Sequence, residues 1–119
     1  MVPGSYNFPL TRGSYWSDPF DFKVSGVAMN LTGYAARMTF RDVASDAVVF
    51  TLTTANGGIS TASASSGRLT PAILATLFAT VSFGITALRF DFELIPPSGE
   101  DYAQCYFRGI TPLDQEQSR

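Results

Sequence analysis

Two carboxylates, Asp91 and Glu93, are the residues whose type and spacing could carry acid–base chemistry. They alternate with apolar residues in Leu88–Leu94, so a β-strand would place both on one face. A pair of positioned carboxylates can serve as general acid and general base. Nothing nearby in the sequence supplies a nucleophile or an oxyanion hole to accompany them. A solvated or ion-paired strand face therefore explains this pair better than catalysis does.

The composition excludes most other catalytic and metal-binding sites. The 119 residues include no His and a single Cys, Cys105. A Ser-His-Asp triad, a Cys-His pair and a His/Cys zinc site all need residue types that the chain lacks. Asp18, Asp21, Asp42 and Asp46 do not have the spacing of a calcium-binding loop, which predicts solvated turn residues instead. We expect no enzymatic activity, no cofactor and no bound metal.

The charge pattern bears on the class of partner. The net charge is −2 and the isoelectric point is near 4.8, with scattered Arg residues, which argues against binding to a nucleic-acid backbone. The start, Met1–Gly4, lacks the basic and apolar regions of a signal peptide, and the apolar run Pro71–Val81 is too short to cross a bilayer. Charged residues make up 15% of the chain, against about a quarter in a usual soluble domain. This predicts a soluble chain that buries neutral or apolar surface against partners, with no membrane partner.

Alternation of apolar and polar residues predicts a series of short strands, the clearest over residues 20–24, 34–41, 47–54 and 88–94. Asn56-Gly57-Gly58 predicts a tight turn, because Asn and Gly tolerate positive φ. Thr70 and Pro71, followed by good helix formers as far as Leu77, predict one short helix with Thr70 as its N-cap.

About seven short strands separated by turn signals, with one short helix, predict an all-β, antiparallel β-sandwich. We expect one domain over residues 1–113 and a flexible polar tail at residues 114–119. Burial of a large apolar side chain contributes about 1.5–3 kcal/mol, so a set of ten can hold this domain without a disulfide. The predicted core consists of Phe20, Phe22, Met38, Phe40, Val48, Phe50, Leu52, Phe90, Phe92 and Leu94.

The first candidate interface residues are Tyr15, Trp16, Arg37 and Arg41. Adjacent residues on a strand point to opposite faces, so either Tyr15 or Trp16 is exposed or covered by a partner. Core packing, an interface anchor and a carbohydrate platform all remain open for this pair. Arg37 and Arg41 face outward opposite the carboxylates of the 88–94 strand, which predicts either cross-strand ion pairs or a docking patch.

The other candidate interface residues are Tyr102, Tyr106 and Phe107. They belong to a predicted last strand over residues 101–110 that is apolar on both faces. We expect this strand to lie at an edge of its sheet, where an unpaired apolar strand invites pairing with another chain.

The order of these signals resembles a known family. Asn30–Met38, the Val-Val-Phe-Thr-Leu strand, Asn56–Ile59, Leu69-Thr70 and Leu88–Leu94 together are similar to the small immunoglobulin-like structural proteins of tailed bacteriophages, in particular the N-terminal module of baseplate upper proteins. The resemblance runs from about Tyr6 to Gly109. The family pattern has Leu-Pro-Ala-Gly before the late strand, where this chain has Val81-Ser82-Phe83-Gly84.

The resemblance implies an immunoglobulin-like fold and a structural role in the virion, as a tail or baseplate component that connects the tail to fibres or neighbouring subunits. Its partners would be other virion structural proteins in a symmetric, multi-copy particle assembled in the host cytoplasm. The tail is favoured over the head as its location. A capsid decoration protein and a host-glycan-binding module are alternatives, and the glycan platform would consist of Tyr15, Trp16 and Tyr102.

Overall fold

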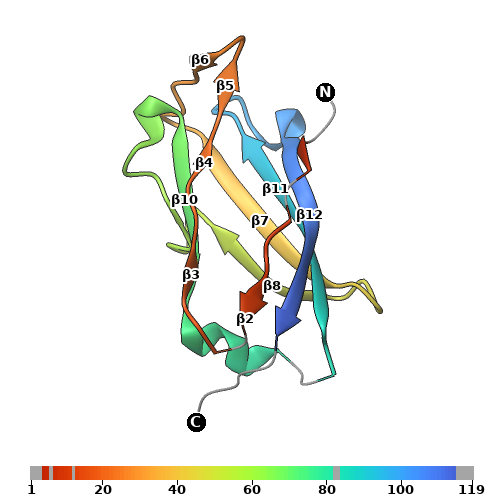
Figure 1. The fold of residues 1–119 in the computed structure, drawn as a ribbon. Helices are drawn as coiled ribbons and strands as arrows, with labels where there is room; N and C mark the ends of the chain where they lie inside the picture. Colours follow the sequence, from red (N-terminus) through yellow and green to blue (C-terminus); the bar gives the residue numbers. More distant parts are fainter. Residues whose placement is uncertain (1–3, 6, 12, 82–83, 115–119) are drawn as a thin grey trace.

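Two β-sheets pack face to face in the computed structural model, which describes residues 4–5, 7–11, 13–81 and 84–114 (Figure 1). The buried apolar residues of the two sheets form one core between them, so the predicted all-β sandwich is confirmed. The larger sheet consists, in spatial order, of β1 (Gly4–Ser5), β12 (Gln104–Asp114), β11 (Ala87–Ile95), β7 (Ala35–Asp42) and β8 (Val48–Thr53), with β2 (Leu10–Thr11) also beside β12.

The second sheet is built around β10 (Arg68–Ile73), which pairs with β9 (Ile59–Ser60), β3 (Trp16–Ser17) and β4 (Phe20–Asp21). β3 and β4 keep the same antiparallel register along β10, so they are two halves of one strand. The interruption includes Pro19, which has no N–H to donate to a ladder. A separate hairpin of β5 (Lys23–Val24) and β6 (Val27–Ala28) continues from this broken strand.

The last strand is not the free edge that the sequence predicts. β12 pairs with β11 on one side and with the short strands β1 and β2 on the other, and the pairings with β1 and β2 are parallel. The sheet is therefore mixed rather than purely antiparallel. β1 and β2 lack a clear alternation of apolar and polar residues, so the sequence does not predict them as strands, and they become strands through pairing with β12. β12 ends at Asp114, within the predicted tail, and residues 115–119 lie outside the described residues.

Nine of the ten predicted core residues are buried, and Val48 is the exception. Phe40 pairs with Phe50, but Arg41 pairs with Val48, so Val49 is an extra residue in β8. Such a β-bulge shifts the alternation by one position. Val48 therefore lies on the outer face with 54% of its surface exposed. The core also contains residues outside that predicted set: Phe8, Leu10, Leu31, Ala36, Ile59, Ala64, Leu69, Ile73, Phe78, Val81, Leu88 and Leu113.

The predicted helix at residues 71–77 is wrong in position and type. Residues Arg68–Ile73 form a strand, because Leu69, Pro71 and Ile73 face the core with period two and β3, β4 and β9 supply hydrogen-bonding neighbours. A helical segment starts only at Ala75. The described residues contain no α-helix, only the 3-10 helices η1 (Ala64–Ser66), η2 (Ala75–Thr80) and η3 (Glu100–Tyr102), and none of these could span a membrane.

The edge of the larger sheet at β8 is covered by a side chain. The Thr53 N–H donates to Asn56 Oδ1 at 3.0 Å, and Asn56 Nδ2 donates to the Thr51 carbonyl at 3.1 Å. The Thr54 N–H bonds to the Ala36 carbonyl of the neighbouring strand, so by alternation Thr51 and Thr53 direct their backbone groups away from β7. The amide of Asn56 thus takes the place of a further strand. The same Oδ1 accepts the Gly58 N–H at 2.8 Å, which fixes the turn that the sequence predicts.

Replacing Asn56 should open this edge. Asn56→Ala removes the amide and leaves the backbone of Thr51 and Thr53 unpaired on a strand, Val48–Thr53, that carries no charge. We expect a loss of about 1 kcal/mol in the free energy of unfolding and association that increases with protein concentration, measured by urea denaturation and sedimentation velocity. Asn56→Asp is the matched control, because its carboxylate repels a second strand edge. Equal sedimentation of the unchanged protein and Asn56→Ala at every concentration would contradict this role.

Candidate functional site

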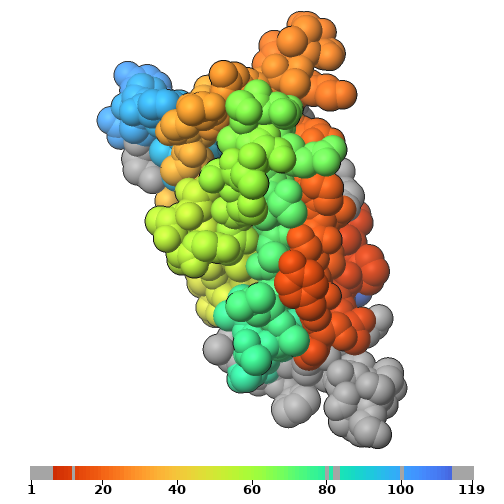
Figure 2. Space-filling view, turned by 90° about the vertical axis from the view of Figure 1, so that its left-hand side faces the viewer, coloured from red at the N-terminus to blue at the C-terminus, as the bar shows by residue number. Residues whose placement is uncertain are grey.

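The hairpin of β5 and β6 projects from one end of the sandwich (Figure 2). Ser25 and Gly26 at its tip have φ values of 52° and 80°, and two consecutive positive φ values suit the tight turn that joins adjacent antiparallel strands. Val24 is 58% exposed and Val27 is 69% exposed. An uncharged tip with two apolar side chains in solvent is a surface suited to contact with another molecule.

Gly67 holds the base of this hairpin against the sandwich. The Phe22 N–H donates to the Gly67 carbonyl at 2.8 Å, and the Met29 N–H donates to the Phe22 carbonyl at 2.9 Å. Gly67 is buried with φ +82°, and a Cβ there would lie 2.8 Å from the Phe22 oxygen and 2.9 Å from the Met29 oxygen. Only glycine therefore allows this approach of the two segments. In the sequence, Gly67 only follows a run of small residues at positions 60–66, which does not indicate this constraint.

An ion pair joins the strand that leads into the hairpin to β10. Asp21 and Arg68 are direct cross-strand neighbours. Arg68 Nε donates to Asp21 Oδ1 at 2.8 Å, and Nη2 donates to Oδ2 at 3.2 Å, so the contact is bidentate. The hydrogen bond from Arg68 lowers the pKa of Asp21 below its ordinary value of 3.8, although partial desolvation opposes the shift. The same hydrogen bond raises the pKa of Arg68.

A hollow of about 180 Å³ lies at the same end of the molecule, and three tyrosines line it: Tyr34, Tyr102 and Tyr106. Tyr34 stands at the start of β7 and also borders a second hollow of about 270 Å³ beside Leu31. The Tyr106 ring meets the Phe22 ring edge to face, with centroids 5.4 Å apart and planes at 72°. Phe22 therefore links the hairpin base to the hollow. The sequence indicated Tyr102 and Tyr106 but missed Tyr34.

A β-bulge explains why the last strand has apolar residues on both faces. Phe92 pairs with Phe107, whereas Glu93 pairs with Cys105, so Tyr106 is an extra residue. Tyr106 and Phe107 consequently both turn toward the sandwich, where the Phe107 ring lies 5.0 Å from that of Phe20. Both residues therefore pack partly buried against the core, whereas Ile110 of the same strand is 48% exposed.

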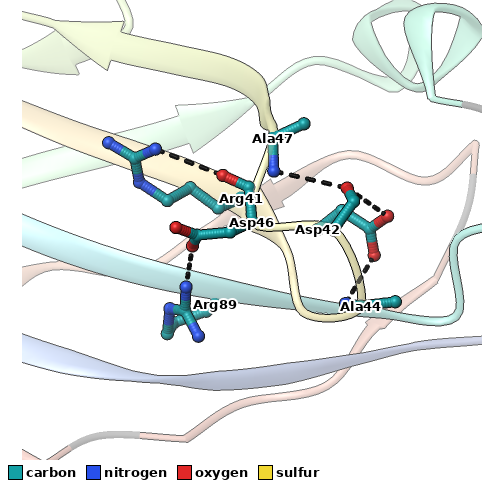
Figure 3. A network of polar contacts seen from close by, with 7 residues as sticks. Arg41, Asp42, Ala44, Asp46, Ala47 and Arg89 are labelled. Atoms are coloured by element: carbon teal, nitrogen blue, oxygen red, sulfur yellow. Dashed lines mark hydrogen bonds and ion pairs between the residues drawn. The ribbon is translucent and has the colours of Figure 1, made fainter.

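The two charged candidates on the outer face of the larger sheet are held by contacts within the chain, Arg37 in an ion pair and Arg41 in a hydrogen bond. Arg37 lies opposite Glu93 in the register and its Nη2 is 2.8 Å from Glu93 Oε1, which confirms the predicted cross-strand pair. Arg41 lies at the other end of β7, where its Nη1 donates to the backbone carbonyl of Asp46 at 3.3 Å. Figure 3 shows Asp46 between two arginines, because its carboxylate also pairs with Arg89. These contacts fix the loop between β7 and β8.

The remaining candidates, Tyr15 and Trp16, lie away from the hollow. The Trp16 ring stacks on the Phe8 ring, with centroids 4.4 Å apart and planes 9° from parallel. In the strand pairing, Trp16 lies opposite Ile73 of β10. Tyr15 is 63% exposed. The expected exposure of one of the two aromatics thus falls on Tyr15. A platform of Tyr15, Trp16 and Tyr102 is not assembled, because η3 and β3 lie at different places on the sandwich (Figure 1).

No group of three or more potential metal-ligating side chains occurs in the described parts of the chain. No protein-family model matches this chain, and no curated protein is significantly similar to it. The hairpin, the tyrosine hollow and the paired charges are therefore the features of the chain that bear on its function.

Comparing Gly67→Ala with Gly26→Ala separates two effects on the free energy of unfolding. Both substitutions place alanine at a positive φ, but only the one at Gly67 also adds a steric clash at the hairpin base. Both glycines have φ near +80°, so alanine at either position costs about 1–2 kcal/mol. Nothing lies within 4 Å of a Cβ at Gly26, whereas at Gly67 it would clash with the Phe22 and Met29 backbone. We expect Gly67→Ala to lose at least about 1 kcal/mol more of the free energy of unfolding than Gly26→Ala. Equal losses in urea denaturation would contradict the packing role of Gly67.

The Asp21–Arg68 pair should make stability depend on pH in the acidic range. The pKa of Asp21 is lower in the folded chain than in the unfolded chain, so the pair stabilises the fold above the unfolded value and is lost as the pH falls through the folded value. Asp21→Asn should therefore be less stable than the unchanged protein at pH 7, and the difference should disappear as the pH falls through the lowered pKa of Asp21. The measurement is urea denaturation of both proteins at each pH. A difference that persists unchanged in acid would show that the charge of Asp21 is irrelevant.

Proposed function

We propose that this chain is a non-enzymatic structural protein of a tailed-bacteriophage virion, a tail or baseplate component that connects the tail to fibres or neighbouring subunits. The resemblance of its strand and turn motifs to small immunoglobulin-like phage proteins motivates the proposal. The observation that carries it furthest is the projecting hairpin, with Val24 and Val27 largely in solvent. The chain would act by packing its apolar and neutral surface groups against neighbouring subunits and not by catalysing a reaction.

The hairpin has the properties of a docking arm. Full burial of an exposed valine contributes about 1.5 kcal/mol or more, so two valines at one tip give a small but specific contact. A symmetric particle repeats each such contact in every copy, which strengthens assembly without a large single interface. Phe22, Gly67 and the Asp21–Arg68 pair fix the base of the arm, so the arm loses little conformational entropy when it docks.

The location in the particle is tested by immunogold labelling of purified virions with an antibody to this chain. Label along the tail or at its tip is the expected result. Label spread over the head would replace the tail assignment with a capsid decoration role. Absence of the chain from intact particles would overturn the virion proposal.

The docking arm is tested by Val24→Thr combined with Val27→Thr, which keeps β-branched side chains of similar shape but removes the apolar tip. We expect the doubly substituted chain to fold normally and to be incorporated into particles at least about tenfold less than the unchanged chain. Val43→Thr, at an exposed valine in the loop between β7 and β8, is the matched control and should be incorporated normally. Normal incorporation of the hairpin variant would remove the arm from the assembly mechanism.

A further inference from the structure

The tyrosine hollow is rich in aromatic side chains. It holds three of the five tyrosines of the chain, together with Ser98 and Gln104, and Leu94 and Pro96 form its apolar wall. No charged residue lines it among the described residues. A ligand that fits this hollow therefore combines an apolar face with several neutral hydrogen-bonding groups.

The Tyr106 ring and the backbone that carries Tyr102 are held in place before any ligand binds. The bulge in β12 turns Tyr106 inward onto the edge of Phe22. Tyr102 is carried on η3, whose backbone is held by hydrogen bonds from the Tyr102 N–H to the Gly99 carbonyl at 3.1 Å and from the Gly99 N–H to the Pro96 carbonyl at 2.9 Å. A preformed aromatic site loses little conformational freedom on binding.

The hydroxyl groups of Tyr34, Tyr102 and Tyr106 make no hydrogen bond to another described residue. A phenolic hydroxyl can donate one hydrogen bond and accept others. The side chains of Ser98 and Gln104 add further donors and acceptors at the rim. Five neutral polar side chains thus surround one small aromatic hollow, and their hydrogen-bond donors and acceptors are available to a ligand.

We propose that this hollow binds one unit of a neutral saccharide. A pyranose ring presents an apolar C–H face, which suits a tyrosine ring, and a girdle of hydroxyls, which suits the tyrosine, serine and amide groups. A volume of about 180 Å³ lies below the range of about 300–1,000 Å³ typical of larger ligands, so one sugar ring is held and further units extend past the exposed Tyr102. The inference goes beyond the structural role and does not depend on it, because a chain outside any particle could bind a sugar in the same way.

A proline-rich peptide is the competing ligand, since aromatic surfaces also recognise polyproline helices. Such a peptide extends by about 3.1 Å per residue and needs an elongated groove. A compact hollow with polar groups on its rim fits a polyhydroxylated ring better.

The test titrates the isotope-labelled chain with a panel of neutral sugars, namely glucose, galactose, N-acetylglucosamine and their disaccharides, and follows amide chemical shifts. At least one sugar should shift residues 98–104 and the start of β7, with a dissociation constant of about 10 mM or tighter. Tyr102→Ala should weaken that binding at least about tenfold, and Tyr34→Phe, which removes only a hydroxyl, about two- to tenfold.

Tyr15→Ala is the matched control, because Tyr15 and Tyr102 are equally exposed, at 63% each, and only Tyr102 borders the hollow. It should leave sugar binding unchanged. Shifts that are absent for every sugar, that vanish equally in Tyr15→Ala, or that appear only with a polyproline peptide would each overturn the saccharide proposal. Because the measurement uses the isolated chain, its failure is distinct from failure of the virion role, which is decided on particles.

Discussion

The inward side chains of β11 must be covered by the second sheet for the sandwich to form. Phe92 is the centre of this contact, with its ring 5.1 Å from that of Phe20 and 5.6 Å from that of Phe22. Aromatic pairs at such distances add about 0.5–1.5 kcal/mol to the burial of their area. Phe20 and Phe22 belong to the segment that leads into the projecting hairpin, so closure of the core also fixes the direction of the hairpin. Phe22 supports Tyr106 as well, and the hairpin and the hollow therefore share one foundation.

The two edges of the larger sheet are closed by different means. At β12 the short parallel strands β1 and β2 occupy the hydrogen-bonding positions, whereas at β8 the side-chain amide of Asn56 does so. Exposed edges are the usual route to unwanted strand pairing. Because β1 and β2 are only two residues long and β8 is capped by Asn56, the larger sheet offers little edge backbone, and its contacts with other molecules are expected at the ends of the sandwich. The projecting hairpin and the tyrosine hollow are located there.

Much of the fold follows from the alternation of apolar residues, and the deviations have local physical causes. The pattern in Leu88–Leu94 placed β11 correctly, and of the two alternatives left open for the outward charges, ion pairs or a docking patch, the structure shows an ion pair at Arg37 and Glu93. Val48 was misassigned because a bulge costs one residue of register and leaves no mark in composition. Pro71 suggested a helix because its fixed φ suits a first helical turn, yet it lies in β10 at the gap between the pairings with β3 and β4, where its missing N–H removes no hydrogen bond to them. Tyr34 could not be joined to Tyr102 and Tyr106 from the sequence, since their proximity depends on tertiary packing and on the second bulge.

Several of the few charged residues of the chain are paired with one another. Arg37, Arg68 and Arg89 each have a carboxylate partner within the chain, so these three charges stabilise strands and loops instead of facing a ligand. The projecting tip and the hollow, by contrast, present apolar and hydroxyl groups. Salt screens interactions between exposed charges but hardly affects apolar contacts or neutral hydrogen bonds. The apolar tip and the neutral lining of the hollow would therefore act through shape and hydrogen-bond matching, with the exposed Lys23 and Asp101 as the charges beside them.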